Sequence, residues 1–274
     1  KTCRPARASS KRFAVSYTDS HAHLNAAEFD PDRAEVLARA RAADVTRILT
    51  IASGTALAEV ERTFAQAEAE ADLWVGLGIH PHDARHATAE LLARLKKLAR
   101  HSRVLAWGEI GLDYHYDHSP RATQRQVFRE QLYLAGELGL PVLIHCREAW
   151  EDCLEVLEDR WASTGRGGIL HCFSGTLEEA REAIGWNFLI SFAGNLTFPR
   201  AENLRAVASA LPLEWLLIET DCPFLAPQAL RGKRNESAYV REVAAEMGRL
   251  KGMTSEEIGL RTSENFLRLL PTRE

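Results

Sequence analysis

Eight short apolar segments, separated by stretches with helical patterns, constrain the fold of this chain most strongly. Most of them lack the alternation of apolar and polar residues that marks a half-exposed strand, which is typical of parallel strands covered on both faces. Their C-terminal ends lie roughly 20 to 35 residues apart, which suits one helix and two loops per strand. The segments are Ala14–Ser20, Arg47–Ala52, Trp74–His80, Val104–Glu109, Val142–His145, Gly168–His171, Phe188–Phe192 and Trp215–Glu219.

The stretches between these segments predict helices. Thr88–Arg100 carries leucines at helical spacing on one face, and Pro31 stands at the first helical position after Asp30. Thr254 with Glu257 forms a capping-box pattern at the start of the last stretch. The predicted helices are Pro31–Ala43, Ala56–Ala69, Thr88–Arg100, Gln124–Leu138, Leu177–Ile184, Ala201–Ala210, Ala238–Leu250 and Ser255–Leu269.

Strands that are each followed by a helix predict a single (β/α)₈ barrel. The length of 274 residues fits such a barrel, which typically takes about 250. We expect the barrel domain to span residues 14–274, and the basic N-terminal segment 1–13 to lie outside it as a transit peptide or a disordered tail. A doubly wound open sheet is the alternative. It would not bring polar residues from five separate strands to one point.

Composition narrows the possible partners and the compartment. The net charge of −4 argues against nucleic-acid binding by broad positive charge. No stretch approaches the roughly 20 apolar residues of a membrane span, so we expect no membrane association. The five cysteines include no Cys-x-x-Cys pair, which argues against a disulfide framework and favours a reducing compartment.

Six potential metal ligands follow or end the apolar segments. A barrel gathers such positions at its C-terminal face, whereas independent structural roles would not place all of them there. The residues are His21, His23, Glu109, His145, His171 and Asp221.

Four imidazoles and two carboxylates suffice for two divalent ions. Mixed nitrogen and oxygen ligands suit Zn²⁺ or Mn²⁺, with Mg²⁺ a further candidate where waters complete the coordination. Each oxygen of a carboxylate can bind a different ion, so Glu109 can bridge two metals. Many metal-dependent barrels bridge their two ions with a chemically modified lysine instead. No lysine stands at a strand end in this sequence. Asp221 is the candidate base for the attacking water.

The chain closely resembles the TatD family of metal-dependent deoxyribonucleases from about Tyr17 to the last helix. The motifs that carry the resemblance are Asp-Ser-His-Ala-His-Leu, Gly-Ile-His-Pro-His, Gly-Glu-Ile-Gly-Leu-Asp-Tyr, Pro-Val-Leu-Ile-His-Cys-Arg, Leu-His-Cys-Phe-Ser-Gly, Ile-Glu-Thr-Asp-Cys-Pro-Phe-Leu and Arg-Gly-Lys-Arg-Asn-Glu. The resemblance implies divalent-metal hydrolysis of DNA in the cytoplasm, usually as a 3′-to-5′ exonuclease on single strands or 3′ ends, and no obligate protein partner is evident.

The resemblance also implies how the ligands divide. His21, His23 and Asp221 would hold the first ion, His145 and His171 the second, and Glu109 would bridge. Two departures from the family pattern bear on substrate choice. Ser237 stands where proline is common, and Tyr114–Ser119 is unusually rich in His and Asp.

Candidate substrate contacts surround the predicted ligands. Arg147 follows His145 by two residues on a strand, so both side chains share a face and the guanidinium could grip a phosphate. A basic loop after the last strand is the second expected phosphate contact. The candidates are His80, His82, Asp113, Arg147, Lys233 and Arg234.

Three functions compete for this sequence. A phosphodiesterase acting on DNA ends leads. The same centre would also polarise the carbonyl of a small amide or lactone, or act on a small phosphoester. A non-catalytic scaffold is a third reading, against which the complete ligand set argues.

Overall fold

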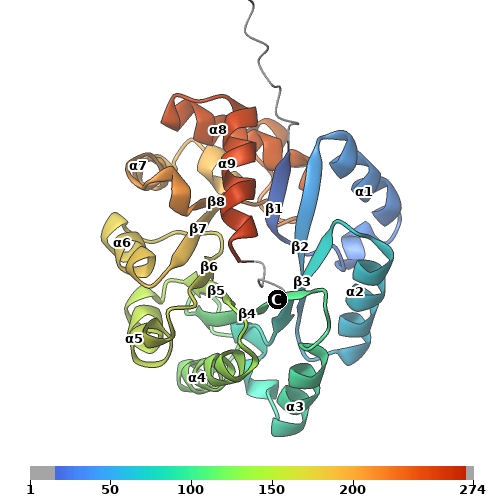
Figure 1. Cartoon of the computed structure of the whole chain (residues 1–274), viewed down its shortest axis with the longest axis vertical. Coiled ribbons are helices and arrows are strands. Elements are labelled where there is room, and N and C mark those ends of the chain that lie inside the picture. Colours follow the sequence, from blue (N-terminus) through green and yellow to red (C-terminus); the bar gives the residue numbers. More distant parts are fainter. Residues whose placement is uncertain (1–15, 270–274) are drawn as a thin grey trace, which may run out of the picture.

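The computed structural model describes residues 16–269 as a nearly closed ring of parallel strands wrapped in helices (Figure 1), with the segment after the last strand joined to the first strand by a parallel bridge between Cys222 and Ala22. The strand order β1 to β8 follows the chain, and every neighbouring pair is parallel. The strands are β1 (Tyr17–Ala22), β2 (Val45–Ser53), β3 (Leu73–Gly78), β4 (Val104–Asp113), β5 (Val142–Arg147), β6 (Gly168–Leu170), β7 (Phe188–Phe192) and β8 (Leu216–Ile218).

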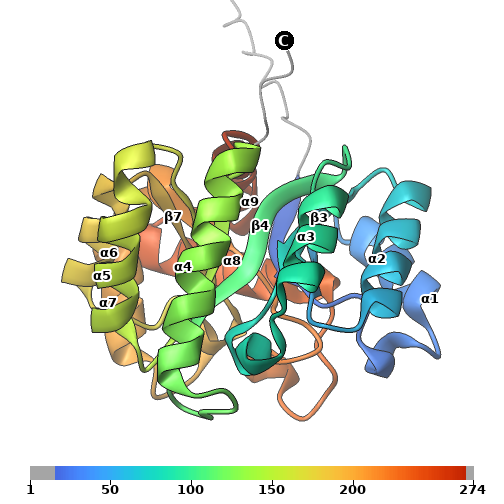
Figure 2. The same cartoon turned by 90° about the horizontal axis from the view of Figure 1, so that it is seen from below.

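Helices alternate with the strands and cover the outside of the ring. Figure 2 shows α4 lying along the outer face of β4, with α3 beside α4. The helices are α1 (Arg33–Ala42), α2 (Leu57–Ala69), α3 (Ala89–Leu98), α4 (Arg121–Leu138), α5 (Trp150–Arg160), α6 (Leu177–Gly185), α7 (Glu202–Ala210), α8 (Val240–Lys251) and α9 (Ser255–Leu267). The predicted (β/α)₈ barrel is confirmed. The basic segment 1–13 and residues 14 and 15 of the first predicted strand lie outside the described residues.

Helix α5 was missed, because we assigned no helix between the fifth and sixth strands. Its apolar side chains do show the helical pattern, with Cys153, Leu154 and Leu157 at positions i, i+1 and i+4 and all of them buried. The helix begins without a side-chain cap at Ala149. The usual start signal is therefore absent from the sequence.

Other boundaries differ by a few residues. Helix α1 begins at Arg33, with Asp32 at its N-cap, so Pro31 precedes the helix instead of opening it. The capping box of Thr254 and Glu257 is present at α9. Strand β4 continues four residues beyond Glu109 to Asp113, so Glu109 lies inside the strand and Asp113 at its end.

Two kinds of core hold the barrel. The larger lies between the strands and the surrounding helices. The smaller fills the interior of the ring toward the N-terminal ends of the strands, here called the lower end, with apolar side chains from β2 and from β4 to β8, and Phe266 of α9 covers it there. Its members are Leu49, Ile51, Leu105, Ala106, Leu143, Ile169, Leu189, Leu217 and Phe266. The polar side chains lie above this layer, toward the C-terminal ends of the strands.

Candidate metal centre

A pocket of about 690 Å³ opens at the C-terminal face of the barrel, and most of the predicted site residues line it. Five of the six proposed ligands reach its surface. The sixth, His21, is fully buried. The lining ligands are His23, Glu109, His145, His171 and Asp221.

The first group of ligands joins the two ends of the barrel sheet. The Nε2 atoms of His21 and His23 lie 3.1 Å apart, and Asp221 Oδ1 lies 3.2 Å from the Nε2 of His23. Backbone hydrogen bonds fix this arrangement. The Asp221 N–H donates to the carbonyl of His21, and the His23 N–H donates to the carbonyl of Cys222. The loop after β8 is therefore held against β1, and Asp221 cannot move independently of the histidines.

The second group comes from the neighbouring strands β5 and β6, with His145 on β5 and His171 directly after β6. His145 Nδ1 and His171 Nε2 are 3.2 Å apart, and each lies 2.9 Å from Oε1 of Glu109. The His171 N–H donates to the carbonyl of Ile144, which aligns the two histidines side by side.

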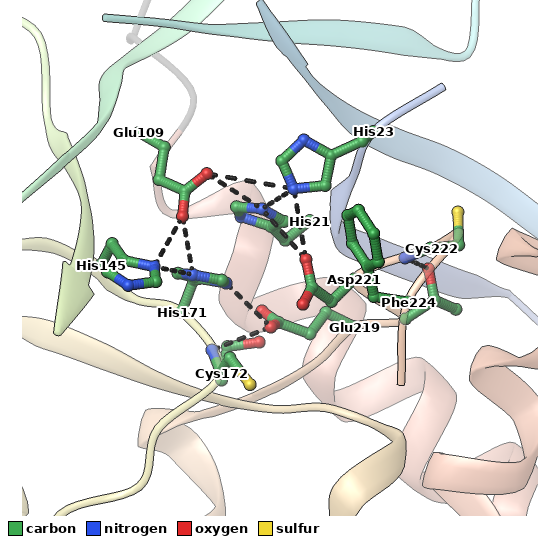
Figure 3. Close-up of polar contacts among 12 residues, drawn as sticks. His21, His23, Glu109, His145, His171, Cys172, Glu219, Asp221, Cys222 and Phe224 are labelled. Atoms are coloured by element: carbon green, nitrogen blue, oxygen red, sulfur yellow. Dashed lines mark hydrogen bonds and ion pairs between the residues drawn. The ribbon is translucent and has the colours of Figure 1, made fainter. Parts of the chain in front are cut away.

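Glu109 divides its two oxygens between the groups (Figure 3). Oε1 faces His145 and His171, whereas Oε2 lies 3.6 Å from Nε2 of His21. Strand β4 shifts register against β5 between Trp107 and Ile110, which is where this side chain projects inward. Gly108 permits the close approach, since a Cβ there would lie 2.4 Å from the carbonyl oxygen of Leu143. A single carboxylate thus stands between two separate sets of imidazole nitrogens.

These spacings fit divalent cations. Two nitrogens bound at about 2.0–2.1 Å to one tetrahedral ion lie about 3.3 Å from each other, close to the observed separations. Oε2 of Glu109 is buried and has no hydrogen-bond partner among the described residues. A buried carboxylate oxygen without a partner is costly, and a cation would compensate it. Three ligand triads within residues 16–269 satisfy the geometry of an ion site: His21–His23–Asp221, His21–Glu109–His171 and His80–Glu109–His145.

The electrostatics of the centre keep Glu109 ionised. Burial alone would raise the pKa of this carboxyl group, but His171, His80 and His21 outweigh it and hold the pKa well below its usual value. Burial lowers the pKa of His21 well below 6.5, which favours the neutral imidazole that a metal requires. Burial opposes protonation of His171 too, but Glu109 and Glu219 raise its pKa well above 6.5. A cation would therefore compete with a proton for His171.

Two further carboxylates orient the second pair of histidines. His145 Nε2 donates to Asp113 Oδ2 at 3.0 Å, which turns Nδ1 toward Glu109. Glu219 Oε1 lies 3.2 Å from His171 Nδ1 and accepts the Cys172 N–H. Such outer carboxylates fix the tautomer and raise the basicity of a ligating imidazole. The i, i+2 pairing of Glu219 with Asp221 was the signal for Glu219, although we did not predict it as a site residue.

Two buried glutamines of α4 position the neighbouring loops. Gln131 accepts from the N–H of Ile79 and donates to its carbonyl, so it fixes the backbone just before His80. Gln124 likewise accepts from the N–H of Asp113 and donates to its carbonyl. Gln131 carried a sequence signal as a polar residue on an apolar helical face, whereas nothing in the sequence marked Gln124.

The predicted substrate contacts divide into two sets. Four of them line the pocket: His80, His82, Asp113 and Arg147. His80 comes within 3.4 Å of Glu109 Oε1, and burial lowers its pKa to about 4. His80 thus lies beside the second ligand group.

The other two predicted contacts, Lys233 and Arg234, do not line the pocket. The guanidinium of Arg234 donates both to Asp32 and to the carbonyl of Glu28, and it lies over the ring of Phe29. Lys233 is exposed on the loop after β8. Of the predicted basic contacts, Arg147 alone faces the pocket.

A β/α barrel with a mixed histidine and carboxylate centre at its C-terminal mouth defines a metal-dependent hydrolase. Residues 18–271 match the family described as TatD related DNase. The chain belongs to this family, as its motifs predicted.

Three relatives illustrate the similarity. An uncharacterized metal-dependent hydrolase of Bacillus subtilis, YabD, is 46% identical over 92% of this chain and 97% of its own length. A protein of Cronobacter sakazakii named 3′-5′ ssDNA/RNA exonuclease TatD is 38% identical over 90% of this chain and 95% of its own. The crystal structure of YjjV, a TatD homologue of Escherichia coli, superposes with a TM-score of 0.87 at 30% identity, covering 94% of this chain and 98% of that one.

Proposed function

We propose that this chain is a 3′-to-5′ exonuclease that removes nucleotides from the 3′ ends of single-stranded DNA, with two divalent ions of Mg²⁺, Mn²⁺ or Zn²⁺. The observation that carries the proposal is the division of Glu109 between two imidazole groups on the pocket floor. The choice of substrate is supported by a relative of 38% identity, which is named a 3′-5′ ssDNA/RNA exonuclease.

The residues of the chain then take distinct roles. His21, His23 and Asp221 would hold one ion, His145 and His171 the other, and Glu109 would contribute one oxygen to each. Two divalent ions bound there would supply Lewis-acid activation of the phosphoryl group and of the attacking water. Asp221, which lines the pocket with 14% of its side chain exposed, accepts the proton that the water loses.

Arg147 supplies the positive charge for the substrate. It lines the pocket two residues beyond His145, and its guanidinium stacks over the ring of Tyr116 at 4.8 Å. A stacked guanidinium keeps its edge free to donate to phosphate oxygens.

We also propose a cytoplasmic location. Within the described chain, Cys146, Cys153, Cys172 and Cys222 are free thiols, as a reducing compartment permits. None of the helices in residues 16–269 is both long and apolar enough to cross a bilayer.

End-labelled oligonucleotides test the function. Metal-free protein, reloaded with each of the three ions in turn, is incubated with a 5′-labelled single strand and with a panel of small amides, lactones and phosphoesters. We expect a ladder that shortens from the 3′ end, abolished by chelation and by Glu109→Ala. Turnover of an amide or lactone without any cleavage of the oligonucleotide would contradict the proposal and favour the small-molecule alternative.

A further inference from the structure

Two exposed aromatic rings stand at the mouth of the pocket. Large apolar side chains that are strongly exposed are few within residues 16–269, namely Tyr116, Tyr133, Phe224 and Leu267. Tyr116 and Phe224, with 52% and 54% of their surface exposed, both line the metal pocket. Exposed rings beside a site are informative because an apolar surface in water is unfavourable unless it meets a ligand.

The two rings come from opposite sides of the barrel. Tyr116 lies in the loop after β4 and Phe224 in the loop after β8. Since the strands follow the order β1 to β8 around the nearly closed ring, strands four positions apart face each other across it. The metal centre therefore lies between the two rings.

Phe224 is held in place although its ring is exposed. Its N–H donates to the carbonyl of Asp221, and its own carbonyl accepts from Nδ2 of Asn235 at 2.6 Å. The ring meets His23 edge-on, with centroids 5.9 Å apart (Figure 3). Phe224 is thus fixed directly beside the first ligand group and still presents apolar surface to the pocket.

Tyr116 forms part of a stack beside the second ligand group. Its N–H donates to Asp113 Oδ1, the carboxylate that also orients His145. The ring lies parallel to that of His118 and carries the guanidinium of Arg147 at 4.8 Å. Tyr116 and His118 belong to the His- and Asp-rich segment that departs from the family pattern, whereas Arg147 comes from the end of β5.

We infer that Phe224 and the Tyr116–Arg147 stack hold the bases of the two nucleotides that flank the bond being cut. This inference rests on the proposed function. A phosphate bound at the centre lies between the two platforms, so its neighbouring bases can reach one platform each. Aromatic rings and guanidinium planes stack on any base but only when that base is free of its own helix. The two platforms would therefore select unpaired ends, without preference for sequence.

Abasic oligonucleotides provide the test. Phe224→Ala and Tyr116→Ala are compared with wild type on three single strands: one intact, one lacking the 3′-terminal base and one lacking the penultimate base. Tyr133→Ala is the matched control, because this tyrosine is exposed on α4 and does not line the pocket. Phe224→Tyr and Tyr116→Phe retain a ring at each position, and metal content is measured for every variant.

On the intact strand, each alanine variant should lose roughly 5- to 150-fold in kcat/KM, the range expected for one stacked base. The ring-retaining variants should recover most of the activity that the alanine variants lose, and Tyr133→Ala should match wild type. Each alanine variant should also lose its defect on one of the abasic strands, a different one for Phe224 than for Tyr116, because the missing base has no ring to meet.

The outcomes separate two failures. If wild type does not cut the intact strand with any of the three ions, the proposed function fails and this inference with it. If wild type cuts it and the alanine variants do so equally well, the inference alone is overturned. A defect that persists on both abasic strands, or that follows a loss of metal, would also overturn it.

Discussion

The two ends of the barrel interior are built from opposite kinds of side chain. The lower end is filled by leucines, isoleucines and Phe266, all within 2% of complete burial. The upper end holds Glu109, His21 and His171, which are buried almost as deeply. Burial stabilises the lower layer, at about 25 cal/mol per Å² of apolar surface, whereas it destabilises ionised groups in the upper layer. The lower end therefore stabilises the fold. The upper end carries a buried negative charge on Glu109, which a bound cation would neutralise.

The largest expected effect comes from Glu109→Ala. It removes the carboxylate shared by both ligand groups, so we expect the loss in kcat to exceed the loss for Asp221→Asn and the ion content to fall. Steady-state kinetics at saturating metal, with elemental analysis of the same samples, measures both quantities. Full metal content in this variant would contradict the claim that Glu109 at the upper end helps to bind the ions.

Asp221→Asn should come next. The amide keeps the shape of the side chain but does not accept a proton, and general-base loss costs on the order of 10²–10⁴-fold in kcat. The circular dichroism spectrum and the midpoint of urea unfolding should match those of wild type. A wild-type rate at saturating metal would rule out the proposed role of Asp221.

Leu217→Ala tests the lower end. Leu217 is 1% exposed within the apolar layer, and its truncation should lower the free energy of unfolding by about 2–5 kcal/mol. Under conditions where the variant is folded, kcat should stay near wild type. An equally large loss of kcat, with the stability unchanged, would contradict the division of roles.

The smallest expected effect concerns the salt dependence of DNA binding. Arg147→Ala should reduce the log–log salt slope of binding by about 0.7 for single strands, because one phosphate contact is lost. The double variant Lys233→Ala/Arg234→Ala should change it less, since neither residue lines the pocket and Asp32 already engages Arg234. If the double variant instead flattens the slope more, our original prediction of a phosphate contact at this loop would be favoured.

The sequence predicted the barrel because each apolar run and most helices are local patterns. Helix α5 was missed where the capping signal was absent, and the strand limits erred where residues beyond the apolar run, such as those after Glu109 in β4, still pair with a neighbour. The six candidate ligands could be predicted because a parallel barrel gathers its strand ends.

The remaining features of the site depend on contacts between distant segments. Spacing along the chain does not reveal that Asp113 turns His145 so that Nδ1 faces Glu109. It also does not reveal that Asp32, some 200 residues away in sequence, occupies Arg234. A residue's availability for substrate is set by such partners, which only the folded chain defines.

The metal content of the purified protein tests the central claim most directly. Metal-free protein is loaded in turn with Zn²⁺, Mn²⁺ and Mg²⁺, washed free of excess ion and analysed by elemental mass spectrometry, with His145→Ala/His171→Ala as the comparison. The account predicts up to two ions per chain in wild type, fewer in the double variant, and loss of activity on chelation. No ion above background in wild type, with activity unaffected by chelation, would contradict it.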